Sequence, residues 1–480
     1  MDDRGSNLES QPFDAARSVD SLPGPHPLPL IGNLTQLDPV HFHSMLEDFA
    51  RQFGPIFKLR VLNSVFVATA RRSDISHILH DRPDLWRRTE RTNLLEELGA
   101  RGLFTAEGQE WRRQRKLVMH ALTPEVIHRF FPQMVRLTER LQRRWMKAVE
   151  EGREPDLLRD LKAFTLDVTV GLAMGQDLNV LENEADPLQR DVEFLFTRLA
   201  RRLTTPVPYW RVFRLPVDRE TDAAVARVRH AVAGFVARAR ERLAAVPARR
   251  ENPADMLEAM VIERDAPGSG MSDEDLIGNA VLMVFAGEDT TSNTIAWLLQ
   301  LLASAPSAWE KLALEATQVL GADTVLRDFR ALDKLPWLDL CTREAMRLKP
   351  VAPMLGFEPT QDLVLGDVRL PAGILVFALM RHAFTIDTHL ERAEEFLPER
   401  WLAEPGQEQD DPSRKLLPFG GGPRFCPGRY LAMTEIRMVA SMLARCFTLS
   451  PKAGAPPVDE VYTFTMTPSA LPVLLQRRAL

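Results

Sequence analysis

A lone cysteine stands in a glycine-rich loop near the end of the chain. Residues 417–430 read LPFGGGPRFCPGRY, so Cys426 follows three consecutive glycines and has an arginine within three residues on either side. Glycine has no side chain, so this segment can pass close to a flat ligand. Helical spacing begins just after the cysteine, and the free N–H groups of a helix N-terminus favour a thiolate. We therefore expect a metal ligand or a nucleophile here, although a lone cysteine is more often a core residue. Cys341 and Cys446 lie on helical patterns and are assigned to the core.

Polar residues interrupt an apolar helix in the middle of the chain. Residues 276–302 have the pattern of a long helix buried on nearly all sides, yet Glu288, Asp289 and Thr290 lie at its centre. Charge is costly in such a place, so these acids need a solvated pocket, a partner or a catalytic task. Thr290 can donate to a carbonyl of the preceding turn, which bends the helix and opens a groove. A carboxylate beside a hydroxyl can relay protons. The alternative is two acids on a solvated face.

Two further pairs of residues have helical spacing, but neither pair by itself indicates a particular function. Glu344 and Arg347 lie three residues apart and so share one helix face. Taken alone, this is a surface pair that stabilises a helix by about 0.3 to 0.5 kcal/mol. Trp111 and Arg115 lie one turn apart on another predicted helix.

The elements that must position these residues are mostly helices. We expect residues 1–21 to form a flexible tail and residues 22–480 to form a single domain. The prolines of 22–34 predict an extended path, after which the patterns predict a helix ending at Gly54 and a hairpin of two short strands. From about 70 to 350 the periodicity is helical, and short strands, a long loop and a last helix follow. The fold class is mainly α with a small β part.

Composition excludes several classes of protein. The 480 residues are 45% hydrophobic and 26% charged, as in ordinary globular proteins. A formal net charge of −6 argues against a nucleic-acid binder. Three cysteines without CxxC spacing exclude a disulfide framework or a cysteine-rich metal site and favour a reducing compartment. The N-terminus is acidic, and no run approaches the roughly 18 apolar residues of a spanning helix. We expect a cytoplasmic monomer without a membrane anchor.

The cysteine loop carries a resemblance to a known family. FxxGxRxCxG, the haem-binding signature of the cytochrome P-450 family, is matched by Phe419, Gly422, Arg424, Cys426 and Gly428. The central helix resembles the oxygen-activation motif AGxDTT of the same family, matched by Ala286, Gly287, Asp289, Thr290 and Thr291. The resemblance extends over nearly the whole chain. It implies one triangular, mainly helical domain with haem b, iron protoporphyrin IX, between the long central helix and the cysteine loop.

The resemblance also implies roles for single residues. Cys426 becomes the fifth ligand of the iron, and such a thiolate favours O–O cleavage. Asp289 and Thr290 become the proton relay. A structural triad is implied for Glu344, Arg347 and Arg400, the last from a PER segment. Haem propionates are expected to meet Trp111, Arg115 and Arg424. The chain departs from many members in having Phe357 where they have an arginine, so one propionate contact is in doubt, with Arg381 or His382 as a substitute.

The reaction implied by the resemblance inserts one oxygen atom from O2 into a lipophilic molecule, by hydroxylation or epoxidation. The substrate is expected to be a natural-product intermediate, fatty acid or terpenoid. With no GxGxxG fingerprint and no second module after Cys426, electrons are expected from a separate ferredoxin or flavodoxin and its reductase. Such an acidic partner would bind a basic surface, for which the candidates are Arg112, Arg113, Lys116, Arg414, Lys415 and Arg429. The alternative is that these residues are ordinary solvated charges.

Two other functions remain open at this point. One is a haem-thiolate isomerase or dehydratase that rearranges a hydroperoxide, which the intact Asp289 and Thr290 disfavour and which would need no reductant. The other is a non-enzymatic haem sensor, which would not turn over with any oxidant. By family position, the substrate pocket is expected to be walled by Leu94, Leu95, Phe104, Met283, Phe285, Met354, Leu355, Phe357, Phe464 and Met466, although such residues are as often plain core.

Overall fold

The structure, a computed structural model, describes residues 16–89, 93–183, 186–205, 208–385, 390–402 and 416–478. Contacts divide the chain into two compact units. The sheet unit contains Met1–Glu90, Ala352–Ala393 and Phe419–Phe425, and the helical unit contains Arg91–Val351, Glu394–Pro418 and Cys426–Leu480. The cysteine loop therefore changes unit between Phe425 and Cys426, and each unit is described by itself below.

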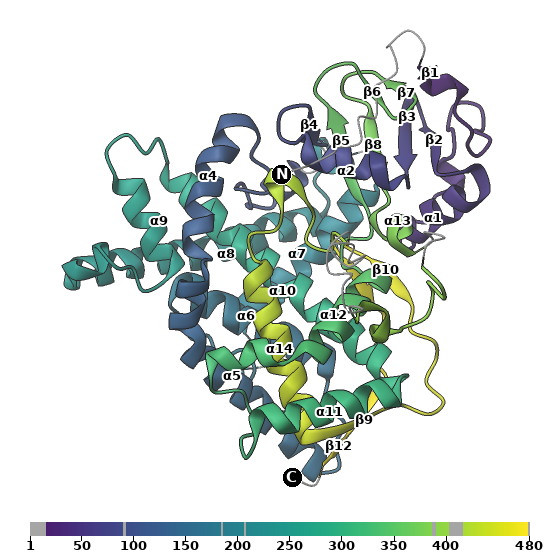
Figure 1. The fold of residues 1–480 in the computed structure, drawn as a ribbon. Helices are drawn as coiled ribbons and strands as arrows, with labels where there is room; N and C mark the ends of the chain where they lie inside the picture. The colour runs from purple at the N-terminus through teal and green to yellow at the C-terminus, as the bar shows by residue number, and fades with distance from the viewer. Residues whose placement is uncertain are drawn as a thin grey trace, which may run out of the picture. The chain divides into compact units, whose positions relative to one another are not determined.

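The sheet unit is built on a five-stranded sheet with the order β2-β3-β8-β5-β4 and a three-stranded sheet with the order β1-β7-β6 (Figure 1). Its strands are β1 (Arg17–Ser18), β2 (Ile56–Val61), β3 (Ser64–Thr69), β4 (Trp86–Arg88), β5 (Leu355–Pro359), β6 (Leu363–Leu365), β7 (Val368–Leu370) and β8 (Leu375–Ala378). Its helices are α1 (Phe42–Phe53), α2 (Arg72–His80) and α13 (Met380–Thr385).

The predicted helix and hairpin at the start of the sheet unit are confirmed. Helix α1 ends at Phe53, and Gly54 caps it with a φ of 97°, a conformation that favours glycine. Strands β2 and β3 pair in antiparallel register from Ile56 opposite Thr69 to the turn beside Ser64. Part of the expected tail has regular structure, because β1 pairs in parallel with β7 and a 3₁₀ turn follows it. Residues 1–15 lie outside the described residues.

The helical unit contains most of the helices. They are α3 (Asn93–Glu97), α4 (Gly108–Ala121), α5 (Pro124–Glu150), α6 (Leu157–Met174), α7 (Pro187–Thr204), α8 (Pro216–Ala245), α9 (Met256–Asp265), α10 (Asp273–Ala303), α11 (Pro306–Leu320), α12 (Pro336–Leu348) and α14 (Arg429–Cys446). Four strands form two antiparallel two-stranded sheets, β9 (Phe447–Pro451) with β12 (Val473–Arg477) and β10 (Glu460–Tyr462) with β11 (Met466–Pro468). The mainly α fold class with a small β part is confirmed.

Helix α10 is the central element of the helical unit, and it contacts α6, α12 and α14 (Figure 1). A capping box starts it: the Ser272 hydroxyl accepts from the Asp275 N–H, and the Asp275 carboxylate accepts from the Ser272 N–H. Two glycines allow close packing further along. A Cβ on Gly278 would lie 2.0 Å from the Arg101 carbonyl oxygen, and one on Gly287 would lie 2.1 Å from the Thr169 hydroxyl. The helix is thus fixed along much of its length.

A buried carboxylate joins α12 to the 3₁₀ turn Pro398–Trp401, which precedes the cysteine loop in sequence. Both oxygens of Glu344 accept from the Arg347 guanidinium, at 2.8 and 2.9 Å. Arg400 Nε donates to the same carboxylate at 2.8 Å, and so do the Trp401 indole at 2.9 Å and the Leu397 N–H at 3.1 Å. Glu344 and Arg347 are buried. Helical spacing indicated Arg347 and the family resemblance implied Arg400, but neither indicated Trp401.

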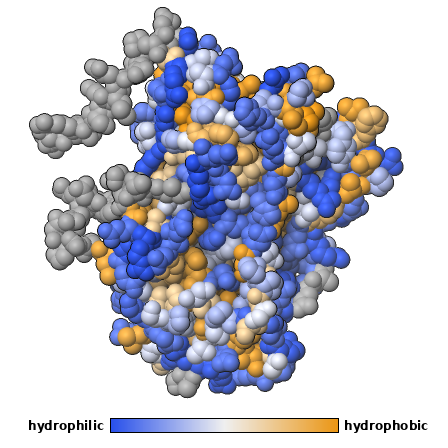
Figure 2. Space-filling model, turned by 90° about the vertical axis from the view of Figure 1, so that its right-hand side faces the viewer, coloured by the Kyte–Doolittle hydropathy of each residue, from blue (hydrophilic) through white to orange (hydrophobic). Residues whose placement is uncertain are grey.

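The view in Figure 2 shows hydrophilic residues over most of one face, with separate hydrophobic patches between them. No helix in the described part of the chain combines the length and hydrophobicity needed to cross a membrane.

We predict that Glu344→Gln lowers the free energy of unfolding by about 3 to 5 kcal/mol, because it leaves the buried Arg347 and the partly buried Arg400 without a carboxylate. Chemical denaturation followed by circular dichroism would measure this loss. The matched control is Glu399→Gln in the same 3₁₀ turn, where the half-exposed ion pair with Lys311 at 2.7 Å should contribute less than about 1 kcal/mol. Equal losses in the two variants would contradict the structural role of Glu344.

Candidate functional site

Cys426 lies two residues before the cap of helix α14. Gly428 is the N-cap, and its carbonyl accepts from the Ala432 N–H at 2.9 Å. The backbone N–H groups of Gly428 and Arg429 donate to the Cys426 thiol. Burial raises the pKa of this thiol above its usual value, although the two N–H groups and the nearby Arg115 guanidinium act in the opposite direction. The sulfur therefore lies where the first turn of α14 offers hydrogen-bond donors, as the sequence predicts.

The segment before Cys426 needs its glycines for a local reason. Gly420 and Gly422 have φ angles of 72° and 63°, which other residues rarely adopt. A Cβ on Gly422 would also lie 2.1 Å from the Leu79 carbonyl oxygen, so the loop passes directly against the end of α2. Phe419 and Arg424 are half-buried residues of this same part of the sheet unit.

Helix α4 places a buried cation near the thiol. Trp111 and Arg115 lie one turn apart, and both are buried. Arg115 is close enough to Cys426 to act on the pKa of its thiol. On the same helix, Gln114 accepts from the Asn279 side chain at 3.3 Å, which ties α4 to α10. The other face of α4 is exposed at Arg112, Arg113 and Lys116, whereas Arg414 and Lys415 lie outside the described residues.

One stripe is left uncovered in the middle of α10, where the other residues between 281 and 299 are buried. Ala286 is exposed, and Met283, Gly287 and Thr290 are half-buried, whereas Phe285 beside them is buried. These four uncovered positions recur at the spacing of one helix face. Ala286, the exposed one, has a small side chain, so the stripe leaves room next to the middle of the helix, whereas Gly287 at its edge packs against Thr169 of α6.

The polar residues of α10 point in different directions. The Thr290 hydroxyl donates to the Ala286 carbonyl at 2.8 Å, the bond that the sequence predicts. The buried Asp289 carboxylate instead accepts from the Asn293 side chain at 3.0 Å and from the Thr465 hydroxyl, just before β11. Within the described residues no hydrogen bond joins Asp289 to Thr290. Sequence reasoning missed Asn293 and Thr465, although Asn293 at i+4 from an acid was a usable signal.

Glu288 excludes the simple alternative of a solvated acidic face. It is buried like Asp289, and burial raises the pKa of its carboxyl well above the usual range. One of its oxygens, Oε2, has no hydrogen-bond partner among the described residues. Its carbonyl accepts from the Thr165 hydroxyl of α6 at 2.9 Å. Both acids therefore lie inside the helical unit.

Aromatic residues gather beside the N-terminal half of α10. The rings of Phe196 and Phe285 lie 5.3 Å apart, and Phe464 lies 6.0 Å from both Phe196 and Phe104. The structure thus brings together three of the predicted pocket residues and adds Phe196 of α7, which the sequence did not indicate. Among the other expected residues, the structure buries Leu94, Leu95 and Met466 and places Met283 on the uncovered stripe.

Three expected pocket residues belong to the sheet unit. Met354 precedes β5, and Leu355 and Phe357 lie on it. Phe357 is fully buried, and the Arg82 guanidinium lies 4.9 Å from the centre of its ring. Within the same unit, Arg381 forms an ion pair with Glu47 at 2.6 Å, so this carboxylate already binds its guanidinium.

These features test whether a flat cofactor that carries its own metal fits the chain. Among the described residues no group of three or more His, Cys, Asp or Glu side chains is placed to hold a bare metal ion. A single thiol at a helix N-terminus can supply one ligand to a metal whose other ligands come from the cofactor. The small, exposed side chain of Ala286 on the α10 stripe would accept a flat face. The residues fit such a group, whereas Cys341 and Cys446 are plain buried thiols.

Comparisons with known proteins agree with this geometry. A family model described as cytochrome P-450 matches residues 22–475. A self-sufficient cytochrome P-450 monooxygenase of Aspergillus kawachii is 26% identical over 445 residues, which cover 91% of this chain and 41% of that protein. Cytochrome P-450 4d2 of Drosophila melanogaster is 26% identical over 471 residues, covering 91% and 90%. A bifunctional cytochrome P-450/NADPH–P-450 reductase of Acremonium egyptiacum is 27% identical over 440 residues, covering 89% and 40%.

The chain thus spans less than half the length of two of these relatives. The family match covers residues 22–475, which include the cysteine loop and α10. The chain therefore belongs to the cytochrome P-450 family of haem-dependent monooxygenases.

Proposed function

We propose that this chain inserts one oxygen atom from O2 into a lipophilic substrate, with electrons from a redox protein. The observation that carries the proposal is the uncovered stripe of α10, where the Thr290 hydroxyl lies on the same face as Ala286. An oxygen-activating enzyme needs an open space beside a proton donor in an otherwise dry core. The stripe offers that combination in the same unit as Cys426.

Haem, the cofactor of this family, would supply oxygen activation and electron storage when bound. In this chain Cys426 would bind the iron, with the N–H groups of Gly428 and Arg429 holding its sulfur. Arg115, Trp111 and Arg424 would donate to the propionates, as charge-assisted bonds favour. Contacts to the flat faces and edges are proposed for Ala286, Phe419, Gly422 and Gly428.

Thr290 and Asp289 are proposed to deliver protons, although their side chains point in different directions. Thr290 keeps its hydroxyl on the open stripe by donating to the Ala286 carbonyl, and rotation about its side-chain bond frees that proton. Asp289 is held away from the stripe by Asn293 and Thr465, so a change of its rotamer or a water molecule must connect it to Thr290. The relay is therefore indirect in the resting arrangement.

A lipophilic substrate is proposed from the walls beside the stripe. Phe104, Phe196, Phe285 and Phe464 present apolar rings around the N-terminal half of α10. Burying apolar surface gains about 25 cal/mol per Å², so such walls favour an apolar molecule over a charged one. A spectral-shift screen of a compound library would identify whether the substrate is a fatty acid, a terpenoid or another natural product.

The electron donor is proposed to be an acidic ferredoxin or flavodoxin, or an NADPH–P-450 reductase of the kind named in the Acremonium relative. Arg112, Arg113 and Lys116 are exposed on the helix whose inner face carries Arg115 beside the thiol. Opposite charges raise the rate of encounter between redox partners. Arg429 at the start of α14 is also exposed and is proposed as a further basic contact.

The first prediction concerns the iron ligand. Cys426→Ala and Cys426→His should abolish the strongly red-shifted Soret band of the reduced carbon monoxide complex, because that band requires thiolate ligation. Cys341→Ala and Cys446→Ala, which change buried core thiols, should keep it. Absorbance spectroscopy of the purified, haem-loaded proteins makes the comparison, and persistence of the band in Cys426→Ala would disprove the assignment.

The second prediction concerns proton delivery. Thr290→Ala should bind haem normally but form less product per electron and more hydrogen peroxide, with product formation slowed by up to about 10²-fold. Asp289→Asn should also slow product formation. Thr294→Ala is the matched control, since its hydroxyl makes the equivalent bond to the Thr290 carbonyl at 2.8 Å but from a buried position. The measurement uses the compound that gives the largest spectral shift. Unchanged coupling in Thr290→Ala would refute the relay.

The third prediction concerns the redox partner. Arg113→Gln combined with Lys116→Gln should weaken reduction by a surrogate acidic ferredoxin about fivefold at low ionic strength, because two attractive charges are lost. The difference should vanish in about 0.5 M salt, where charges are screened within a few ångströms. Lys147→Gln with Lys452→Gln removes the same charge from other exposed sites and serves as the control. Equal losses in both pairs would indicate a non-specific charge effect.

A further inference from the structure

Three threonines lie at the turn between β10 and β11. They are Thr463, Thr465 and Thr467, in the segment YTFTMTP, and we call them the threonine group. Thr465 is buried, whereas Thr463 and Thr467 are half-buried. The hydroxyl oxygen of Thr467 lies 3.4 Å from that of Thr465 and 3.5 Å from that of Thr463. The three hydroxyls are therefore neighbours in space as well as in sequence.

The threonine group leads to the buried carboxylate of Asp289. The Thr465 hydroxyl donates to Asp289 Oδ2. The side-chain amide of Asn293, one turn further along α10, lies 3.0 Å from the hydroxyl oxygens of Thr465 and Thr467. It also donates to Asp289 Oδ1 at 3.0 Å. Asn293 thus holds two of the hydroxyls and the acid in one cluster.

The threonine group begins near solvent. Thr463 and Thr467 are half-buried, and Ser469 and Ala470, which follow Thr467, are exposed. The Phe464 ring, between the first two threonines, belongs instead to the aromatic cluster beside α10. The turn therefore carries a polar path from its solvent-exposed end to a buried acid, next to an apolar wall.

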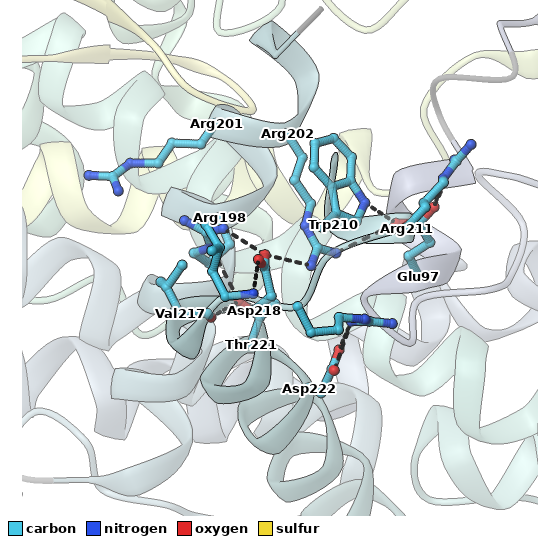
Figure 3. A network of polar contacts seen from close by, with 12 residues as sticks. Glu97, Arg198, Arg201, Arg202, Trp210, Arg211, Val217, Asp218, Thr221 and Asp222 are labelled. Carbon is cyan, nitrogen blue, oxygen red and sulfur yellow. Dashed lines mark hydrogen bonds and ion pairs between the residues drawn. The ribbon is translucent and has the colours of Figure 1, made fainter. Parts of the chain in front are cut away.

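The partners of Asp289 differ in kind from those of another buried acid. Figure 3 shows Asp218 of α8, whose carboxylate accepts from Arg198 at 3.1 Å and is 3.5 Å from Arg202. Guanidinium groups only donate, and an arginine in a protein keeps its proton, so these partners can hold an acid but cannot supply it with protons. A hydroxyl donates one hydrogen bond and accepts up to two, so the threonine group can do both.

Glu288, the other buried acid at the centre of α10, has no such chain. Burial raises the pKa of its carboxyl most strongly, and the charges of Lys162 on α6 and Glu193 on α7 also act on it. Its Oε2 has no hydrogen-bond partner among the described residues. Within that part of the chain, no side-chain hydrogen bond joins Glu288 to Asp289. The threonine group is thus the better connected of the two approaches to Asp289.

We propose that protons consumed at the uncovered stripe of α10 reach Asp289 through the threonine group, in the order Thr463, Thr467, Thr465. This inference rests on the proposed function. Insertion of one oxygen atom from O2 uses two electrons and two protons and gives the oxygenated product and one water molecule. Each hydroxyl passes a proton onward and takes another from behind, so every threonine is restored. Because the gaps between the hydroxyls exceed the about 2.7 Å of a strong O–H···O bond, a small rotation of the side chains precedes each transfer.

The main experiment compares two oxidants in the haem-loaded parent and in Thr467→Val, with the compound that gives the largest spectral shift. With O2 and a surrogate ferredoxin system, Thr467→Val should form product about tenfold more slowly and release more hydrogen peroxide, because one hydroxyl of the chain is lost. With hydrogen peroxide as the oxidant, substrate and peroxide give product and water without protons from solvent, so the variant should match the parent. This change leaves Asn293 and Thr465, the two partners of Asp289, in place.

Two further variants serve as controls. Thr467→Ser keeps a hydroxyl at the same position and should restore the rate with O2. Thr448→Val changes a half-buried threonine of β9, whose hydroxyl donates to the Gln476 carbonyl, and should behave like the parent with both oxidants.

The outcomes separate this route from its alternatives. A parent-like rate of Thr467→Val with O2 would overturn the proposal, and so would equal losses with both oxidants, which would indicate damaged packing. Glu288→Gln should behave like the parent, whereas a slow Glu288→Gln beside a normal Thr467→Val would place the route at α6 instead. A parent that forms no product with either oxidant would refute the proposed function itself.

Hydrogen exchange of residues 459–469 tests the integrity of the turn without turnover. It should be the same in Thr467→Val and in the parent, because the Thr463 N–H still donates to the Thr465 carbonyl and the Ser469 N–H to the Asp459 carbonyl, both at 2.9 Å in the parent. Faster exchange in Thr467→Val would trace its slower turnover to a displaced turn and would overturn the proposal.

Discussion

Asp289, Thr290 and Asn293 place polar groups in the middle of a helix with apolar surroundings, and each must be satisfied without unfolding the helix. Thr290 uses a carbonyl of its own helix. Asp289 uses Asn293 one turn later and Thr465 from a distant segment. Asn293 in turn donates to the hydroxyls beside β11. This solution turns the acid toward β11 and leaves the hydroxyl on the uncovered stripe, which decides where chemistry can occur.

The same helix is held in place by residues that have almost no side chain. Gly278 and Gly287 let α10 approach residue 101 and α6 at distances where a Cβ would collide with oxygen atoms. Gly102 does the same against Asn279, whose side chain accepts from the Leu103 N–H at 2.9 Å. Close backbone packing therefore fixes the helix on several sides, while the stripe at Ala286 keeps its space.

Buried carboxylates that accept several hydrogen bonds also join distant segments of the chain. Glu344 binds two arginines, an indole and a backbone N–H, and Asp218 binds two arginines and a backbone N–H. A charge buried in this way is stable only with all its partners in place. Each carboxylate thus joins segments that are apart in the sequence, α12 with the turn before the cysteine loop in one case and α7 with the start of α8 in the other.

The local features of this protein follow from its sequence. Short-range backbone hydrogen bonds set helices and hairpins, so spacing alone predicted α10, α14 and the β2–β3 hairpin, and neighbouring motif residues indicated the family. The Glu344–Arg347 contact also follows from helix geometry, because residues three apart share a face.

Only the tertiary structure decided the partners of the buried polar and aromatic groups. Thr465 lies 176 residues from Asp289, and Trp210 lies 113 residues from Glu97. Phe196 joined the aromatic cluster, and Arg17 and Ser18 became a strand, only because other segments packed beside them. A polar side chain in the core forms hydrogen bonds with whichever group the packing of distant segments brings within about 3 Å. No local sequence pattern predicts that partner.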